Sequence, residues 1–401
     1  MTAALIIFAA TYFVIAIGRL PGFRVDRTGA AIIGAALMIA FNVLTIEEAY
    51  AAIDYDTIIL LFGMMIVVAN LRLSGFFSAV SAWVVERAHG PVVLLGAIVL
   101  VSGIFSAFFV NDTMCIAMTP LVLELAAALR RNPAPYLLGV AMGANVGSTA
   151  TITGNPQNMV IGSVSRINYL TFAAALGPVA AAGLALTILV LVAVYRKDLR
   201  PHQKIRIEHE RVRVNRVLMW KAVVVSAGMV AFFFAGWPVP KVALVAGAVL
   251  LITRRVKPER VYREIDWGLL VMFIGLFIVV AGVDRTPLAA SLLNEASRFR
   301  LNNPVVLTGA SAILSNLVSN VPAVLLFKPF IPHLPDATRA WLILAMSSTL
   351  AGNLTLLGSI ANLIVVQRAA RDGVNIGFWE YLKAGLPLTV LTIAVGVLLL
   401  R

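Results

Sequence analysis

Long apolar blocks separated by short polar segments fill the chain from end to end. Apolar stretches of about 15 to 25 residues follow one another, and each is long enough to cross a hydrocarbon core of roughly 30 Å. Ala3 to Ile17, Val223 to Ala235 with its flanks, and Leu386 to Leu400 are examples. This pattern predicts an all-α polytopic membrane protein that is embedded in the lipid bilayer.

Composition favours the same class of protein. Hydrophobic residues make up 60% of the 401 residues, charged residues make up 13%, and the mean hydropathy is +0.94. So few charges are insufficient to cover the surface of a soluble domain. The N-terminal block lacks the basic region and the small-residue cleavage site of a signal peptide, so we interpret it as the first span.

The chain carries 32 basic and 19 acidic residues, a formal net charge of +13. The basic residues gather in short loops between apolar blocks, where Lys and Arg mark the cytoplasmic face. This distribution argues against nucleic acid as the partner of the charge. The single cysteine, Cys115, excludes an internal disulfide and a cysteine-based metal cluster.

A repeat relates the two halves of the chain on either side of its most basic loop, residues 196–216. Residues 45–63 read TIEEAYAAIDYDTIILLFG, and residues 257–275 read KPERVYREIDWGLLVMFIG. Five identities align without a gap, each pair 212 residues apart: Glu47, Tyr50, Ile53, Asp54 and Gly63 with Glu259, Tyr262, Ile265, Asp266 and Gly275. We interpret these identities as an internal repeat.

The charges around the two copies are opposite. Residues 45–56 carry four acids and no base, whereas residues 254–266 carry five bases, which the positive-inside rule assigns to the cytoplasm. Equivalent segments on opposite faces are typical of the inverted-topology repeats of secondary transporters.

Counting spans from this orientation gives two inverted repeats of about five spans and one re-entrant hairpin each, with broken helices at the midplane. The expected parts are a first repeat at 1–195 with a hairpin at 91–129 and a broken helix at 136–163, a basic cytoplasmic linker at 196–216, and a second repeat at 217–401 with a hairpin at 304–332 and a broken helix at 339–366. Residues 74–89 and 288–300 have the pattern of amphipathic interfacial helices. The expected location is the cell inner membrane.

Four polar segments interrupt the apolar background, two in each repeat. Val110–Pro120 aligns with Ser319–Pro329 at a separation of 209 residues, and Gly147–Asn158 aligns with Ala351–Asn362 at a separation of 204. Gly, Asn, Pro and Thr favour breaks in the helix, and non-helical backbone at membrane depth is tolerated only inside protein or around a water-filled cavity. Free N–H groups at broken ends suit anions, and free carbonyls suit Na⁺ or a proton donor. The segments predict a midplane substrate site, with helix packing by small residues as the alternative.

The predicted substrate and ion site takes residues from all four segments. They are Asn111, Asp112, Thr113, Gly147, Ser148, Thr149, Thr151, Gly154, Asn155, Asn158, Ser319, Asn320, Gly352, Asn353, Thr355, Gly358, Ser359 and Asn362. No metal site is expected, because the four histidines fall in predicted loops or interfaces without a ligand spacing. No phosphate-binding loop motif is present, so the chain itself is not expected to hydrolyse ATP. The only cofactor expected is a coupling ion, H⁺ or Na⁺.

Asp112 is the sharpest single candidate, because a carboxylate at membrane depth is costly and marks functional sites. Its repeat counterpart, Val321, is apolar, so the hairpin does not require the charge. We expect Asp112 to take up and release the coupling proton or to complete a cation site. The alternative is a cap on the following half-helix. Lys328 either faces the site as a counter-charge or extends to the membrane surface.

At these segments the chain resembles the ion transporter superfamily, which includes divalent anion/sodium symporters, citrate transporters, arsenite-efflux permeases and a branch of Na⁺/H⁺ antiporters. Ser319-Asn320-Val321 with Pro329 is similar to the Ser-Asn-Thr hairpin tip of the symporters, except at Val321, while Asn111-Asp112 looks more like the arsenite-permease tip. Gly154–Asn158 and Gly352–Asn362 resemble the arsenite-permease and melanosomal P-protein branch. The resemblance covers nearly the whole chain. It implies a scaffold, moving transport parts that hold the hairpins and broken helices, and a homodimer.

Several functions remain open from the sequence. The leading hypothesis is a secondary active transporter of a small anion, an inorganic oxyanion or a carboxylate, coupled to H⁺ or Na⁺ through alternating access. Arsenite or antimonite efflux, with or without a soluble ATPase partner, and Na⁺/H⁺ exchange are alternatives within that class. An enzyme is disfavoured because no nucleophile, base or metal set converges, and a channel would not require matched inverted interruptions.

Overall fold

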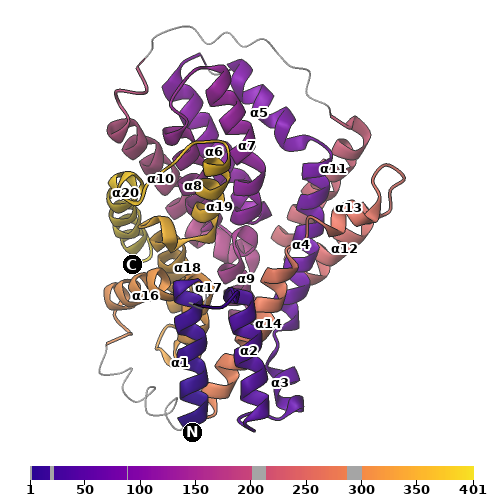
Figure 1. Cartoon of the computed structure of the whole chain (residues 1–401), viewed down its shortest axis with the longest axis vertical. Coiled ribbons are helices and arrows are strands. Elements are labelled where there is room, and N and C mark those ends of the chain that lie inside the picture. Colours follow the sequence, from indigo (N-terminus) through magenta and orange to yellow (C-terminus); the bar gives the residue numbers. More distant parts are fainter. Residues whose placement is uncertain (1, 19–21, 88, 201–213, 287–299) are drawn as a thin grey trace.

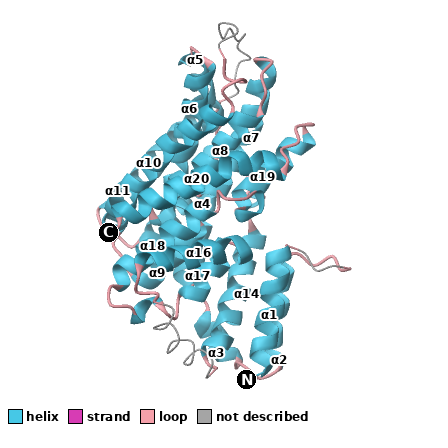
Figure 2. Ribbon diagram, turned by 90° about the vertical axis from the view of Figure 1, so that its left-hand side faces the viewer, coloured by secondary structure: helices cyan, strands magenta, loops and turns pink. Residues whose placement is uncertain are grey.

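The computed structural model describes residues 2–18, 22–87, 89–200, 214–286 and 300–401, and it is helical throughout these ranges, with no strand (Figures 1 and 2). The first half contains α1 (Thr2–Ile17), α2 (Arg27–Ala40), α3 (Ile46–Ala52), α4 (Tyr55–Leu73), α5 (Phe76–Arg87), α6 (Pro91–Phe109), α7 (Asn111–Ala128), α8 (Ala134–Ser148), η1 (Ile152–Gly154), α9 (Pro156–Ser165) and α10 (Tyr169–Val194). The second half contains α11 (Arg216–Phe234), α12 (Val239–Leu251), α13 (Pro258–Tyr262), α14 (Trp267–Asp284), α16 (Pro304–Val318), α17 (Asn320–Phe327), η2 (Ile331–His333), α18 (Ala337–Ala351), η3 (Leu356–Gly358), α19 (Ile360–Arg371) and α20 (Phe378–Leu399).

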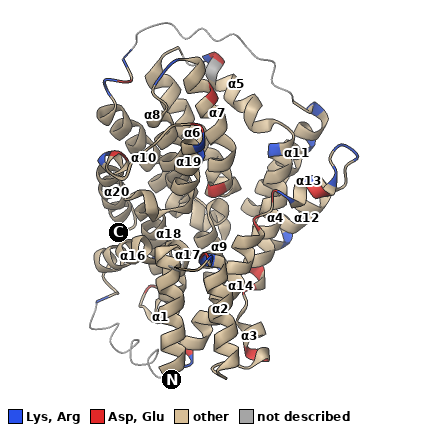
Figure 3. Cartoon of the chain, in the orientation of Figure 1, with Lys and Arg blue, Asp and Glu red and all other residues tan. Residues whose placement is uncertain are grey.

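The helices have the length and surface of a membrane protein. Within the described ranges, α4, α6, α10, α11, α14 and α20 are each long and apolar enough to cross a bilayer. On α11, Val217, Trp220 and Val224 are 59%, 62% and 65% exposed, an apolar face that suits lipid rather than water. Charged residues gather mostly in loops and at helix ends (Figure 3). The predicted all-α polytopic class is confirmed.

The matched glycines of the repeat let helices of opposite halves approach closely. α4 packs against α12, and α14 packs against α2, so each half contributes one helix to both pairs. A Cβ added at Gly63 would lie 2.6 Å from the backbone carbon of Ala243, and one added at Gly275 would lie 2.7 Å from that of Ala31. Ala31 and Ala243 are themselves 212 residues apart. The glycine therefore recurs because the same backbone contact recurs in each half.

The matched aspartates begin equivalent helices. Asp54 Oδ1 accepts a hydrogen bond from the backbone N–H of Thr57 (3.2 Å), and Asp266 Oδ1 accepts one from that of Leu269 (2.9 Å). Each carboxylate satisfies an N–H group that the first turn of α4 or α14 leaves free. The recurrence of Asp at this position follows from this capping role.

Two ion pairs show that α4 and α14 run in opposite directions. Arg72, at the end of α4, pairs with Glu264, just before α14, and Arg285, just after α14, pairs with Glu48 in α3. The start of each helix therefore lies beside the end of the other, and α3 and α13 lie at opposite ends of this pair (Figure 1). This is the geometry of an inverted repeat.

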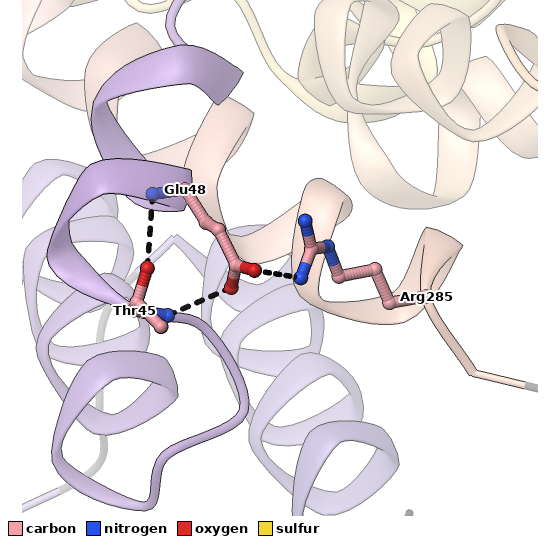
Figure 4. Close-up of polar contacts among 3 residues, drawn as sticks. All are labelled: Thr45, Glu48 and Arg285. Atoms are coloured by element: carbon pink, nitrogen blue, oxygen red, sulfur yellow. Dashed lines mark hydrogen bonds and ion pairs between the residues drawn. The ribbon is translucent and has the colours of Figure 1, made fainter.

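The contact at the α3 end is built around a capping box (Figure 4). The backbone N–H of Thr45 donates to Glu48 Oε2 at 2.8 Å, and the backbone N–H of Glu48 donates to Thr45 Oγ1 at 3.2 Å. The bond from Thr45 and the ion pair with Arg285 hold the pKa of the Glu48 carboxyl below its ordinary value. Glu48 thus joins α3 to the far end of α14.

Three expectations concern segments that are only partly described. Of the linker 196–216, residues 201–213 lie outside the described residues, and so does most of the interfacial helix expected at 288–300. Its expected partner at 74–89 contains α5, Phe76–Arg87. The division of the chain into repeats at 1–195 and 217–401 stays a prediction.

Candidate functional site

Two helix pairs are each interrupted by a single residue with an unusual backbone conformation. Val110 joins α6 to α7 with φ of 61°, and Ser319 joins α16 to α17 with φ of 77°. Non-glycine residues rarely adopt positive φ, and such strain concentrates at functional sites. The two residues are 209 positions apart, the separation of the aligned polar segments. Both breaks leave the first N–H groups of the following helix, α7 or α17, without a helical partner.

A second pair of breaks separates α8 from α9 and α18 from α19. Asn158 Nδ2 donates to the carbonyls of Ser148 (3.2 Å) and Thr151 (2.9 Å). Asn362 Nδ2 donates to those of Gly352 (2.8 Å) and Thr355 (3.1 Å), which are the residues 204 positions further on. In each half the asparagine satisfies carbonyls that the broken helix frees. Asn158 and Asn362 therefore hold the shape of the breaks.

The buried amide of Asn145, on α8, connects the two halves. Its nitrogen donates to Asn353 Oδ1 at 2.9 Å and to Asn362 Oδ1 at 3.0 Å. Its oxygen accepts from Asn111 Nδ2 at 3.0 Å and from Ser359 Oγ at 3.1 Å. Because both ends of the amide are used in a buried setting, this network fixes the position of the α7 tip against α19.

The repeat counterpart of Asn145 is Thr349, and it has a similar role on α18. Thr349 Oγ1 accepts from Asn155 Nδ2 at 3.3 Å and from Gln157 Nε2 at 3.1 Å. The amide of Asn320 fits best with its oxygen toward Gln157 Nε2 and its nitrogen toward the Gly358 carbonyl, both at 3.2 Å. The tip of α17 is thus tied to α9 as the tip of α7 is tied to α19.

A small polar cavity lies where the two tips meet. Its polar lining is Arg27, Asn111, Asp112, Gln157, Ser319, Asn320 and Ser359, with Ile15, Leu269, Met272, Val321, Pro322 and Ile360 among the apolar residues. The cavity measures about 30 Å³, room for about two waters at roughly 10–15 Å³ each. Among the described residues, no partner reaches the buried Asn111 Oδ1. The residues that line the cavity therefore include charged side chains and one amide with an unused acceptor.

A wider vestibule adjoins this cavity on the side where α14 begins. It measures about 550 Å³ and shares Arg27, Leu269, Met272 and Ile360 with the cavity. Asp266 and Gln367 also line it. Because Asp266 caps the N-terminus of α14, the vestibule lies at the N-terminal end of that helix. The shared residues separate the cavity from the vestibule on that side.

The opposite end is closed by contact. α9 packs against α4, and Ser163 Oγ donates to Asp54 Oδ1 at 2.8 Å. Asp54 and Ser163 are the repeat counterparts of Asp266 and Gln367. Asp54 and Ser163 are half-buried, whereas Asp266 and Gln367 are exposed. Equivalent positions are thus closed at one end and open at the other.

Apart from Thr113, the structure divides the predicted site residues into three groups. Asn111, Asp112, Ser319, Asn320 and Ser359 line the cavity. A second group supports it through hydrogen bonds or the adjoining backbone: Ser148, Thr149, Thr151, Asn155, Asn158, Asn353, Thr355 and Asn362. Thr113 follows Asp112 on α7 but does not line the cavity.

The four predicted glycines form the third group, and they lie at close contacts. A Cβ at Gly147 would lie 2.1 Å from the Gly103 carbonyl oxygen, and one at Gly154 would lie 2.1 Å from that of Ser148. Added Cβ atoms at Gly352 and Gly358 would lie 3.1 Å and 2.9 Å from backbone oxygens. These contacts agree with the alternative of helix packing by small residues, and the part of the glycines in the site stays a prediction.

Two further expectations can be compared with the geometry. Asp112 accepts no capping bond at the start of α7, which leaves the capping alternative without support. Lys328 directly follows α17 and is not among the residues that line the cavity.

Sequence reasoning missed Arg27, Asn145 and Gln157. Asn145 and Gln157 lie beside or within the polar segment Gly147–Asn158, and their amide side chains at membrane depth were an available signal. Arg27 belongs to the basic residues in short segments between apolar blocks, which the positive-inside rule places on the cytoplasmic side. The structure places it at the first residue of α2, against the cavity.

Matched broken helices around a polar cavity, inside an apolar helical bundle, define a polytopic membrane transporter. The chain belongs to the citrate transporter family, whose pattern matches residues 4–351. It is 32% identical to a silicon efflux transporter of Oryza sativa subsp. japonica over 94% of this chain and 93% of that protein. It is 28% identical to an uncharacterized transporter of Mycobacterium tuberculosis (strain ATCC 25618 / H37Rv) over 98% of this chain and 97% of that one.

A solved structure has a similar fold. The YdaH transporter of Alcanivorax borkumensis, whose topology is described as unusual, superposes with a TM-score of 0.59. The superposition covers 100% of this chain and 96% of that chain, at 14% sequence identity. The family match and the similarity to the rice transporter confirm the resemblance to the ion transporter superfamily.

Proposed function

We propose that this protein is a secondary active transporter of a small oxyanion or carboxylate, and that Asp112 carries the coupling proton. The observation that carries the proposal is the position of Asp112, half-buried in the wall of the cavity, in the first turn of α7. An ionisable group at this depth is energetically unfavourable, so its presence indicates a function. Proton uptake and release there would couple the proton gradient to movement of the substrate.

Alternating access follows from the inverted repeat. The state described here has a vestibule at the Asp266 end and a closed contact at the Asp54 end. The basic loops around α13 favour the cytoplasm for the Asp266 end, so we infer an inward-facing state in the cell inner membrane. Exchanging the conformations of the two halves would close Asp266 against Gln367 and open Asp54 from Ser163.

A second candidate is efflux of an uncharged or weakly acidic oxyacid such as silicic acid or arsenite. Two observations favour it: the 32% identity to the rice silicon efflux transporter and the Asn111-Asp112 pair at the α7 tip. The same cavity and the same proton carrier serve either direction of transport. Na⁺ coupling and Na⁺/H⁺ exchange are the competing outcomes of the flux test described below. The proposal also includes the homodimer that the resemblance implies.

Flux in proteoliposomes tests the proposal. Labelled citrate, phosphate, sulfate, arsenite and silicic acid would be offered under an imposed pH gradient or an imposed Na⁺ gradient, with Asp112→Asn and wild type side by side. We expect Asp112→Asn to lose accumulation driven by the pH gradient, because it has no titratable group, while it keeps exchange of substrate for substrate. Asp56→Asn is the matched control, since Asp56 is an exposed residue of α4 away from the cavity.

Two results would refute the proposal. Accumulation that follows the pH gradient as well in Asp112→Asn as in wild type would remove Asp112 from coupling. Accumulation that follows only the Na⁺ gradient would replace the proton altogether.

A further inference from the structure

Arg27 is a cation placed at the junction of the cavity and the vestibule. It is the first residue of α2 and lines both spaces, and its side chain is half-buried. Within the described ranges it makes no hydrogen bond and no ion pair. Its counterpart in the second half is Val239, the first residue of α12. The fold therefore does not require a charge at this point of the helix.

Two acids, Asp26 and Asp266, line the vestibule with Arg27, and Asp112 lines the cavity with it. Among the described residues, none of the three forms an ion pair with Arg27. Asp26 Oδ1 accepts from the backbone N–H of Gly29 at 2.8 Å, and Asp266 Oδ1 accepts from that of Leu269 at 2.9 Å. Each of these two carboxylates caps its own helix. A half-buried guanidinium without a counter-ion is unfavourable, and an anion entering from the vestibule would relieve the cost.

Asn111, which also lines the cavity, has an unused acceptor. Asn111 is 3% exposed, and its Oδ1 has no partner among the described residues, although its Nδ2 is fixed by Asn145. Because Nδ2 donates to Asn145, the amide keeps its oxygen as the free end. A buried carbonyl oxygen without a hydrogen-bond donor destabilises the structure by about 1–3 kcal/mol. A fully deprotonated anion has no donor to offer.

We propose that Arg27 binds the charged group of the substrate and that Asn111 Oδ1 accepts a hydrogen bond from a hydroxyl of the same molecule. The site would then select a small oxyanion that retains at least one O–H group and reject oxyanions that have none. This inference rests on the proposed function, and it specifies the chemical class of the anion.

Equilibrium binding to the purified full-length protein tests the inference without any gradient. The probes are inorganic phosphate and arsenate, which keep a hydroxyl near neutral pH, and sulfate, which does not. We expect phosphate and arsenate to bind at least about tenfold more tightly than sulfate, since sulfate leaves Asn111 Oδ1 unpaired. Arg27→Gln should weaken phosphate binding about 10- to 100-fold, and Arg27→Lys should weaken it less, because a point charge is retained without the planar fork.

Arg24→Gln is the matched control, because Arg24 is an exposed residue three positions earlier and lines neither space. The melting temperature of each variant without ligand identifies any that is misfolded, and Arg27→Lys keeps the test valid if Arg27→Gln is one of them. The inference is overturned if phosphate and arsenate do not bind, if sulfate binds equally well, or if Arg27 variants of normal stability bind like wild type. Coupled flux through Asp112 can persist in each of those cases, so failure here is distinguishable from failure of the proposed function.

Discussion

Removing the hydroxyl of Ser163 should shift the protein away from the state described here. Ser163 Oγ donates to Asp54 Oδ1 at 2.8 Å across the closed end, between α9 and α4. The counterpart residue Gln367 lines the open vestibule, as Asp266 does. Ser163→Ala therefore removes a bond that exists in one conformation and is absent from the other, which is the condition for a population shift.

The size of the shift follows from the geometry. A hydrogen bond to a charged group contributes about 1.5–3 kcal/mol. This one is only partly buried, and Asp54 keeps two other donors, the backbone N–H and the Oγ1 of Thr57. We therefore expect about 1 kcal/mol, which corresponds to about a fivefold rise in the ratio of outward-open to inward-open molecules. Gln367→Ala should change the ratio by a similar factor in the opposite direction, because it removes the equivalent bond expected in the other state.

Thiol labelling measures that ratio. The reporter is Met159→Cys in a Cys115→Ser background, since Cys115 is the only native cysteine. Met159 is fully buried in this state, but its counterpart Leu363 lines the vestibule, so the reporter should become accessible only when the closed end opens. With a membrane-impermeant maleimide, the labelling rate should rise about fivefold in Ser163→Ala and fall in Gln367→Ala.

Ser81→Ala on α5 is the control for a serine lost away from this contact. The double variant Ser163→Ala/Gln367→Ala should return near the wild-type rate, because the two bonds favour opposite states. Equal rates in all variants, or a change of the same sign in both single variants, would refute the reasoning that these positions form exchanged gates.

Two further predictions concern stability. Gly147→Ala should destabilise the protein by about 1–3 kcal/mol or more, because the added Cβ would lie 2.1 Å from the backbone oxygen of Gly103. Gly177→Ala is the control, because a Cβ there meets nothing within 4 Å, and it should leave the melting temperature in detergent unchanged. Equal melting temperatures for the two variants would contradict the close packing at Gly147. The lowered pKa of Glu48 means that its stabilising contribution is fully present above the unfolded-state pKa of about 4.3 and is lost as pH falls through the lowered folded-state pKa. Wild type should therefore lose its stability advantage over Glu48→Gln upon acidification below about pH 4, while Glu47→Gln should follow the wild-type profile; an advantage that persists at low pH would exclude the ionised carboxylate as its source.

The sequence predicts the helices well because bilayer thickness fixes their length and each backbone must satisfy its own hydrogen bonds. It also predicts the inverted pairing, since Asp54 and Asp266 cap equivalent helices and Gly63 and Gly275 make equivalent contacts. These features are local, or repeat a local requirement, and a comparison of the two halves is enough to find them.

The cavity is less predictable, because its lining depends on which side chains meet across the halves. Polar residues in a break have the same signature whether they face a substrate or a freed carbonyl, so Asn111 and Asn158 look alike in sequence and differ in role. Arg27 was missed as a lining residue for a related reason. The positive-inside rule predicts on which side of the membrane a cation lies. It does not predict whether the side chain reaches a cavity.

Symmetry and asymmetry have separate roles in this chain. The hydrogen bonds of Asn158 and Asn362 recur at equivalent positions, and so do the helix breaks at Val110 and Ser319. We therefore expect the two halves to close their ends of the pathway through equivalent contacts. A transporter needs this equality, because inward-open and outward-open states must differ little in free energy for both to be populated. Asp112 and Arg27 have apolar counterparts, Val321 and Val239, so neither charge can serve the shared framework. The residues that break the repeat are therefore where coupling and selectivity are expected to lie.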